Sequence, residues 1–198
     1  MEQLEQLFQY FRMYVPLSTA ETEALAAGCR IRSIKRRYFL LQEGDVCTQY
    51  TFVLEGCLKM YYVDHKGTEH NLQFAAENNW IADLGSFHAK APSKLYIEAM
   101  EPSTVVQISY SNLITLYTDH PKFNRNFRVI TEEHFIEQQQ RLLQTISSTA
   151  QERYAYFLER YPELSTRLPN TQIASYIGIT PEFLSKIRKE AARGNKNS

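Results

Sequence analysis

The spacing of apolar and polar residues changes along the chain, and the first part has the period of a helix. Between residues 2 and 28, apolar side chains recur every three or four positions, as on the buried face of an amphipathic helix. Ser18, followed three positions later by Glu21, supplies the capping residues that begin a second helix. This segment therefore predicts two short helices.

From Ile31 to Tyr110 the pattern changes to short runs rich in β-branched and aromatic residues. Gly44, Gly56 and Gly67 lie between the runs, and the last of them ends a predicted hairpin turn. Short strands at fairly even spacing are typical of a small barrel, roll or sandwich. The predicted strands are residues 38–41, 50–54, 58–63, 72–74, 95–97 and 105–110.

Beyond Pro121 the apolar spacing becomes helical again and stays so as far as Ser147. A helix of roughly 27 residues is about 40 Å long at 1.5 Å per residue, which is longer than the preceding roll can cover. We therefore expect part of its apolar face to pack against the same helix of a second subunit, forming a homodimer through residues 119–147. The alternative is a helix that packs wholly within one chain.

A further predicted helix (residues 150–161) and a polar connection (residues 162–169) lead into a segment, residues 171–189, that fits a helix-turn-helix. Such a motif needs a small residue where the second helix crosses the first, and a turn residue that tolerates positive φ. Ala174 and Gly178, four positions apart, meet these two requirements.

The rest of this segment meets the other requirements of the motif. Thr180 is a good N-cap, Pro181 suits the first helical position, and Glu182 places an acid in the first turn. Apolar residues occupy the positions that must fill the wedge between the two helices: Ile173, Ile177, Ile179, Leu184 and Ile187. We interpret the segment as a DNA-recognition motif; the alternative is a helical corner with a solvated charged face.

The face outside the wedge has side chains suited to DNA. We expect Glu182, Ser185 and Lys186 to lie near base edges, and Arg188 and Lys189 to lie near phosphates. The full predicted DNA-binding set is Thr171, Thr180, Pro181, Glu182, Ser185, Lys186, Arg188 and Lys189.

Charge supports this interpretation only locally. The chain has 22 basic and 22 acidic residues, so its net charge of zero points to no polyanionic partner. From Arg153 onward, however, there are eight basic and four acidic residues, which gives +4 there and −4 over residues 1–152. A basic segment of this kind favours a polyanion as its partner.

Other classes of protein find little support. Cys29, Cys47 and Cys57 have neither the spacing of a disulfide framework nor that of a metal site, so we interpret them as packed thiols. The five histidines show no ligand spacing, and no nucleophile, base and orienting group stand together, so we expect no metal, no cofactor and no enzyme activity. Without a membrane-length apolar run or a signal peptide, we expect a soluble cytoplasmic protein with no membrane partner.

The order of these elements resembles the Crp/Fnr family of bacterial transcription regulators over nearly the whole chain. The residues that support the resemblance are Glu43-Gly44-Asp45, Gly56-Cys57-Leu58-Lys59, the Asp64–Gly67 turn, Asp83-Leu84-Gly85 with Phe87, Ile108-Ser109-Tyr110, and residues 171–189. The resemblance implies an α+β fold with N-terminal helices, an antiparallel, jelly-roll-like β-roll, a long dimerisation helix and a small C-terminal helix-turn-helix domain. The implied domains are residues 1–118, 119–147 and 148–198, and the implied partner is a two-fold site on double-stranded DNA.

Within the resemblance, the phosphate-binding cassette departs from the pattern of members that bind cyclic AMP. Ala82 replaces the glycine, Asp83 the glutamate and Ser93 the arginine, and Lys94 lies beside the lost arginine. We therefore expect no usual response to cyclic AMP; an empty pocket, another small effector, or a cyclic nucleotide held by Lys94 all stay open. The candidate ligand-binding residues are Ala82, Asp83, Leu84, Gly85, Ser93 and Lys94, with Trp80, His88, Lys90 and Tyr96 as further candidate lining groups.

The end of the chain is the second departure. Many family members follow the recognition helix with a β-hairpin wing, whereas only Ala191–Ser198, which we expect to fray, follow it here. A shorter domain offers fewer phosphate contacts, although Arg193 is a further candidate for one. The sequence thus predicts a dimeric, sequence-specific DNA-binding transcription regulator. The alternative is a small-ligand or cyclic-nucleotide sensor module that acts through protein contacts and has a vestigial helix-turn-helix.

Overall fold

The computed structural model describes the backbone of residues 2–194 and the side chains of residues 2–191. The chain forms two compact units. Unit 1 comprises the residues up to Tyr62 together with Leu72–His134, and unit 2 comprises Val63–Asn71 and the residues from Phe135 onward. The predicted long helix is present as α5 (Lys122–Ser147), 26 residues long, and it contributes its first half to unit 1 and its second half to unit 2.

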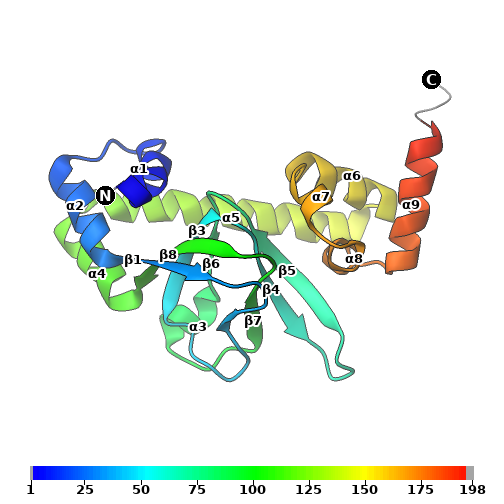
Figure 1. The fold of residues 1–198 in the computed structure, drawn as a ribbon, viewed down its shortest axis with the longest axis horizontal. Helices are drawn as coiled ribbons and strands as arrows, with labels where there is room; N and C mark the ends of the chain where they lie inside the picture. The colour runs from blue at the N-terminus through cyan, green and yellow to red at the C-terminus, as the bar shows by residue number, and fades with distance from the viewer. Residues whose placement is uncertain (1, 195–198) are drawn as a thin grey trace. The chain divides into compact units, whose positions relative to one another are not determined.

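Unit 1 is built on two four-stranded antiparallel sheets that form a roll (Figure 1). One sheet has the strand order β1-β8-β3-β6 and the other the order β2-β7-β4-β5. The strands are β1 (Cys29–Ile34), β2 (Phe39–Leu41), β3 (Gln49–Glu55), β4 (Leu58–Val63), β5 (Glu69–Ala75), β6 (Trp80–Ile81), β7 (Leu95–Ala99) and β8 (Ser103–Ser109). The six predicted strands are confirmed. The sequence did not predict β1 and β6.

Helices α1 (Glu5–Arg12) and α2 (Thr19–Gly28) confirm the two predicted N-terminal helices, and Figure 1 shows both at one end of the roll. Ser18 begins α2 through a capping box with Glu21, whose carboxylate accepts from the Ser18 N–H at 2.7 Å. Two further helices, α3 (Leu84–Ala89) and α4 (Tyr110–Asp119), were not predicted. The predicted last strand included Tyr110, but β8 ends at Ser109, whose hydroxyl caps α4.

The core of unit 1 is aromatic. The ring of Trp80 is fully buried, and its centroid lies 4.8 Å from that of Tyr50, 5.1 Å from Phe52, 5.4 Å from Phe127 and 6.0 Å from Phe11. These rings come from α1, β3, β6 and α5. Their mutual burial attaches α1 and the first half of α5 to the roll.

Unit 2 is helical apart from the hairpin turn at residues 63–71. After α5 it contains α6 (Ala150–Arg160), α7 (Leu164–Arg167), α8 (Asn170–Ile177) and α9 (Pro181–Gly194). Helix α7 lies where the sequence predicted only a polar connection. Helix α9 continues to Gly194, so the expectation of a frayed tail was wrong for residues 191–194, and residues 195–198 lie outside the described part of the chain.

Candidate DNA-binding surface

The turn between α8 and α9 has the geometry that a helix-turn-helix requires. Gly178 ends α8 in the left-handed region, with φ of 71°, and the N–H of Ile179 donates back to the carbonyl of Ala174 at 3.0 Å. The Ala174 side chain is fully buried, as expected for the small residue at the helix crossing. Both sequence requirements of the turn are therefore met in the structure.

The wedge between the two helices is apolar and buried. Four of the five predicted residues have side chains at most 6% exposed, and Ile179 is half-buried. Tyr154 and Phe157 of α6 and Leu164 of α7 complete this small core. The apolar side chains thus hold α8 and α9 in one arrangement, which leaves the opposite face of α9 free.

The first turn of α9 is capped as predicted. The Thr180 hydroxyl accepts from the N–H of Phe183 at 3.2 Å, and Pro181 occupies the first helical position. The N-terminal turn of a recognition helix is the part that contacts base edges in the major groove. The cap therefore fixes where this turn begins and which side chains it presents.

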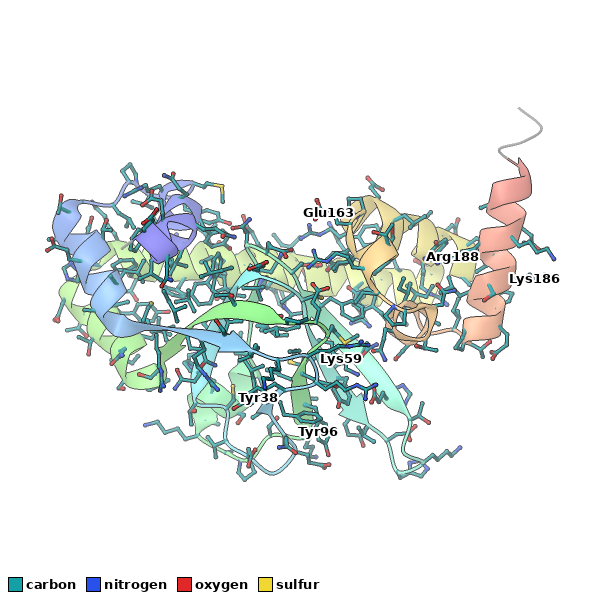
Figure 2. The ribbon with its side chains drawn as sticks, viewed as in Figure 1. Tyr38, Lys59, Tyr96, Glu163, Lys186 and Arg188 are labelled. Atoms are coloured by element: carbon teal, nitrogen blue, oxygen red, sulfur yellow. The ribbon has the colours of Figure 1, made fainter. Side chains whose placement is uncertain are left out.

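Four predicted contact residues lie exposed on α9, namely Glu182, Ser185, Lys186 and Lys189. The side chain of Lys186 is 68% exposed and makes only a long, 3.9 Å ion pair with Glu190; Figure 2 shows it projecting from the outer side of the helix. The Ser185 hydroxyl donates to the carbonyl of Pro181 at 2.9 Å, so its oxygen remains as an acceptor. The structure brings an acid, a hydroxyl and two cations onto one face.

Arg188 does not belong to that face. Its guanidinium donates from Nε to the Tyr154 hydroxyl at 2.7 Å, from Nη1 to Asn170 Oδ1 at 2.5 Å, and from Nη2 to the Ser165 carbonyl at 3.2 Å. The side chain is half-buried, and Figure 2 shows it on the side of α9 turned toward α6 and α7. These contacts make Arg188 an internal cross-link of the domain.

Phe183 is a candidate that the sequence prediction omitted. Its side chain is 39% exposed, and it is the one exposed large apolar group among the described side chains from 161 to 191. It lies between Glu182 and Ser185 in the first turn of α9, where an aromatic ring can contact a thymine methyl group. In the sequence, Phe183 looks like another core residue of the motif. The structure shows that Leu184 and Ile187 fill the wedge, which leaves Phe183 exposed.

The other predicted residues lie outside this first turn. Thr171 is exposed at the start of α8, and the side chain of Arg193 lies outside the described part of the chain. Local sequence patterns do not indicate that α8 is anchored by the hairpin turn of residues 63–71. Asn71 donates its N–H to the Ser175 hydroxyl at 3.1 Å and its amide to the Gln172 carbonyl at 3.0 Å.

Arg141 of α5 completes this anchor. One of its guanidinium nitrogens donates to the carbonyls of Asn71 at 2.7 Å and Tyr176 at 2.8 Å, and the guanidinium lies 4.0 Å from the centre of the Tyr176 ring. Burial raises the pKa of Tyr176 above its usual range, so the phenol stays neutral. Arg141 therefore fixes the C-terminal end of α8 against α5 and the hairpin turn.

The candidate ligand-binding residues of the roll satisfy one another. The Ser93 hydroxyl is buried and donates to Asp83 Oδ2 at 2.7 Å, and Asp83 Oδ1 caps α3 by accepting from the Ser86 N–H at 3.2 Å. Ser93 is also held through its backbone, which accepts from the Gly44 N–H and donates to the Asp45 carbonyl, both at 2.8 Å. The positions of the lost glutamate and arginine thus form an internal hydrogen-bonded pair.

The remaining candidates of the cassette differ in their exposure to solvent. Lys94 and Gly85 are exposed, Leu84 is half-buried and Ala82 is buried. Of the further lining candidates, Trp80 lies in the aromatic core, His88 and Lys90 are exposed, and Tyr96 lies in the second sheet, stacked on Tyr61 with ring centroids 5.2 Å apart. Asp83 and Ser93 are the candidates joined by a direct hydrogen bond, and Ala82, Leu84, Gly85 and Lys94 are their neighbours along the chain.

The other sequence interpretations concern single features. The three cysteines are free, with Cys47 and Cys57 buried and Cys29 half-buried, as expected of packed thiols. Over residues 2–194, histidine, cysteine and carboxylate side chains form no group of three that suits a metal ion. Within the same range, every helix is too short or too polar to cross a bilayer.

Comparisons with known proteins support the fold described above. Residues 31–120 match the family model of the cyclic nucleotide-binding domain, which covers most of the roll. The chain therefore contains a domain of this type, followed by the helix-turn-helix described above.

Curated relatives extend the similarity into the helical part. The chain is 23% identical over 169 residues to the transcriptional activator protein Anr of Pseudomonas protegens, covering 80% of this chain and 68% of Anr. It is 20% identical over 187 residues to the cAMP-activated global transcriptional regulator CRP of Salmonella typhimurium, covering 88% of each. The structure of FixK2 from Bradyrhizobium japonicum has a TM-score of 0.75 at 17% identity, over 84% of this chain and 86% of FixK2. The chain is a homologue of the Crp/Fnr transcription regulators.

Proposed function

We propose that this protein is a dimeric transcription regulator of the Crp/Fnr type that binds a two-fold DNA site through α9. The observation that supports this most directly is the exposed face of that helix. Glu182 supplies an acceptor for cytosine N4, Lys186 supplies donors for guanine O6 and N7, and Phe183 supplies an apolar contact for thymine. Lys189 supplies a cation for a phosphate, which adds affinity without sequence preference.

The proposed dimer rests on the second half of α5. Its exposed apolar residues are Phe135, Ile136, Leu142, Leu143 and Ile146, each more than half exposed. They recur at spacings of seven and four residues, which form one stripe along a helix that packs against another. A second copy of the same helix is the partner that matches such a stripe, and it would give the two copies of α9 that a two-fold site needs.

The proposed regulator does not take cyclic AMP in the usual way. A cyclic phosphate needs a cation at its oxygens, whereas Ser93 occupies the arginine position and its hydroxyl donates a hydrogen bond to Asp83. An anion placed there would meet the Asp83 carboxylate without a facing guanidinium. We propose that DNA binding by this protein is independent of cyclic AMP.

Selection of binding sites from random duplex DNA tests the DNA-binding proposal. We expect a two-fold site with half-sites about one helical turn apart. Lys186→Ala should relax the preference at one base pair of each half-site, whereas Lys189→Ala should weaken all sequences alike and reduce the salt slope by about one per half-site. A folded protein that selects no sequence at low salt would contradict the proposal.

Sedimentation velocity tests the dimer. Leu142→Glu combined with Ile146→Glu should convert the protein to a monomer, because each carboxylate would be placed in an apolar seam. Met13→Glu, at an exposed apolar residue after α1, is the matched control and should leave the dimer intact. A wild-type protein that sediments as a monomer at micromolar concentration would exclude the dimer.

Calorimetric titration with cyclic AMP and cyclic GMP tests the ligand proposal. We expect no saturable heat for either nucleotide. If cyclic AMP binds saturably and Lys94→Ala abolishes the binding, the cassette works through Lys94 and the proposal of independence is wrong.

A further inference from the structure

The aromatic core of unit 1 contains polar atoms whose hydrogen bonds are not made within the protein. Both amide atoms of Asn126, the hydroxyl of Tyr50 and the indole Nε1 of Trp80 are buried and have no hydrogen-bond partner among the described residues. All three residues belong to unit 1. The rings of Tyr50 and Trp80 lie against each other, with their centroids 4.8 Å apart. The unsatisfied atoms are therefore gathered in one part of one unit.

Asn126 is the polar residue in the buried stripe of α5. Its side chain is fully buried, at 0% exposed, and the other buried side chains of this helix are apolar. Phe127, the next residue, has its ring centroid 6.0 Å from that of Tyr50 and 5.4 Å from that of Trp80. Asn126 thus enters the core next to a residue that contacts both of these rings.

An amide without a partner is unfavourable at such a position. Burial of an amide or a hydroxyl without a hydrogen bond costs free energy, and native proteins leave few such groups unpaired. Replacing the amide by an apolar group would avoid this cost. An asparagine in an otherwise apolar stripe, beside two more unsatisfied side chains, therefore points to a bonding partner that is not a protein group.

The three side chains define the chemistry of that partner. Trp80 Nε1 can only donate, the Tyr50 hydroxyl can donate or accept, and the Asn126 amide does both. Burial, and then the nearby Tyr117 phenol, raise the pKa of Tyr50 above its usual range, so its hydroxyl stays protonated. None of the three groups is charged, so a charged molecule would lose its hydration without gaining a counter-charge from them. A neutral molecule with a donor and an acceptor matches the set.

We propose that Asn126, Tyr50 and Trp80 together bind a small neutral molecule that both donates and accepts hydrogen bonds. Water has this chemistry, and so does a small solute with a hydroxyl or an amide. A buried water makes about three hydrogen bonds to groups that are otherwise unsatisfied. Because Asn126 belongs to α5 whereas Tyr50 and Trp80 belong to β3 and β6, the bound molecule links the long helix to the roll. The site does not depend on DNA binding.

The indole N–H of Trp80 is a direct probe of this site. Trp80 is the single tryptophan of the chain, so its indole gives one signal in a heteronuclear NMR spectrum of the full-length protein. We expect a nuclear Overhauser effect between the indole proton and the bound molecule. A cross-peak at the water frequency identifies water, whereas a stoichiometric compound found by mass spectrometry after denaturation identifies a solute. Either result supports the site, and absence of both would overturn it.

Two variants show whether the cross-peak arises at the proposed site. Asn126→Leu keeps the branched shape of the side chain and replaces its two polar atoms, so the peak should disappear. Tyr50→Phe removes the phenol proton, which can relay magnetisation from water, while the other two groups remain, so the peak should survive. A peak that persists in Asn126→Leu, or that is lost in Tyr50→Phe, would contradict the proposal.

A double-mutant cycle tests whether the groups share one molecule. Tyr50→Phe should lower the melting temperature of the wild type, and should lower it much less in the Asn126→Leu background, from which the molecule is already displaced. Tyr96→Phe is the matched control, because its hydroxyl donates to Glu43 at 3.2 Å in the second sheet, and its shift should be the same in both backgrounds.

Additive shifts for Tyr50→Phe would show that the groups act separately, and would overturn the proposal. So would a higher melting temperature for Asn126→Leu alone, because that result is expected of an amide that has no partner. If Asn126→Leu does not fold, the spectra of the wild type and of Tyr50→Phe still decide the question. Loss of DNA binding by the wild type would contradict the proposed function and leave these measurements unchanged.

Discussion

Replacing Arg188 separates two roles that the sequence could not distinguish. The residue was predicted to contact DNA phosphates, whereas in the structure it joins α9 to Tyr154, Asn170 and Ser165. Arg188→Met keeps most of the length and apolar stem of the side chain and removes only the guanidinium. The variant therefore tests the charged group rather than the packing.

The expected loss of stability follows from the three acceptors that are left behind. A hydrogen bond to a charged group contributes about 1.5–3 kcal/mol, and an acceptor that loses its partner adds a desolvation cost. Because the side chain is half-buried and water can replace part of the loss, we expect about 2–3 kcal/mol in total rather than the full sum. For a domain of the size of unit 2, which contains α9, that loss corresponds to a drop of roughly 10–20 °C in melting temperature.

Thermal unfolding followed by circular dichroism measures this change, and binding to the selected DNA site is measured on the same samples below the transition. Lys189→Met, at the neighbouring exposed cation, is the matched control. It should melt like the wild type, bind DNA more weakly and show a shallower salt slope. For Arg188→Met we expect the opposite result. The melting temperature should fall, and DNA binding should be lost only at temperatures at which the domain unfolds.

One result would refute the reasoning. If Arg188→Met melts at the wild-type temperature and binds all DNA sequences more weakly, with a salt slope reduced by about 0.9 per contact, then the guanidinium contacts phosphate. Its hydrogen bonds within the domain would then contribute little to stability.

Three further predictions concern single side chains. On replacement of one contacted thymine by deoxyuridine, the wild type should lose about fourfold in affinity, as expected for one buried methyl group. Phe183→Ala should bind the two sites with equal affinity. Equal loss of affinity in both proteins would exclude the contact. The Ser18 N–H, and then Lys122, lower the pKa of Glu21, so this carboxylate stabilises the fold above its ordinary pKa and loses that effect as the pH falls. Glu21→Gln should therefore flatten the dependence of melting temperature on pH between about pH 6 and 3, and an unchanged profile would contradict the capping role. Gly178→Ala should cost about 1 kcal/mol in urea unfolding, because the φ of 71° is strained for alanine although no atom lies within 4 Å of the added methyl; no change would indicate that the turn relaxes.

Local pattern predicted the motif well. Ala174, Gly178 and the cap at Thr180 act within one short segment, and each has a steric or hydrogen-bonding requirement that its residue type alone can meet. The long helix and most strands were also predictable, because the spacing of apolar residues along a short segment is enough to show a period of 3.6 or 2. The short elements β6, α3 and α7 were missed because so few residues cannot establish a period, and β1 and α4, of six and ten residues, were missed as well.

Contacts between distant residues could not be predicted. Nothing near Asp83 indicates that its partner is Ser93, and nothing near Asn71 indicates that it anchors Ser175. The charge of Arg188 suits phosphate and carbonyl alike, and only the positions of its neighbours decide between them.

The sequence by itself determined where the two N-terminal helices, the long helix and most strands lie and that the C-terminal segment packs as a helix-turn-helix, because propensity, capping and apolar period are properties of neighbouring residues. The tertiary structure decided which charged groups remain available to a partner. The guanidinium of Arg188 is hydrogen-bonded inside its domain and Ser93 is paired with Asp83, whereas the side chain of Lys186 stays exposed. The physical reason is that a hydrogen-bonding group has a limited number of bonds to make, and the fold determines how many are already used within the chain.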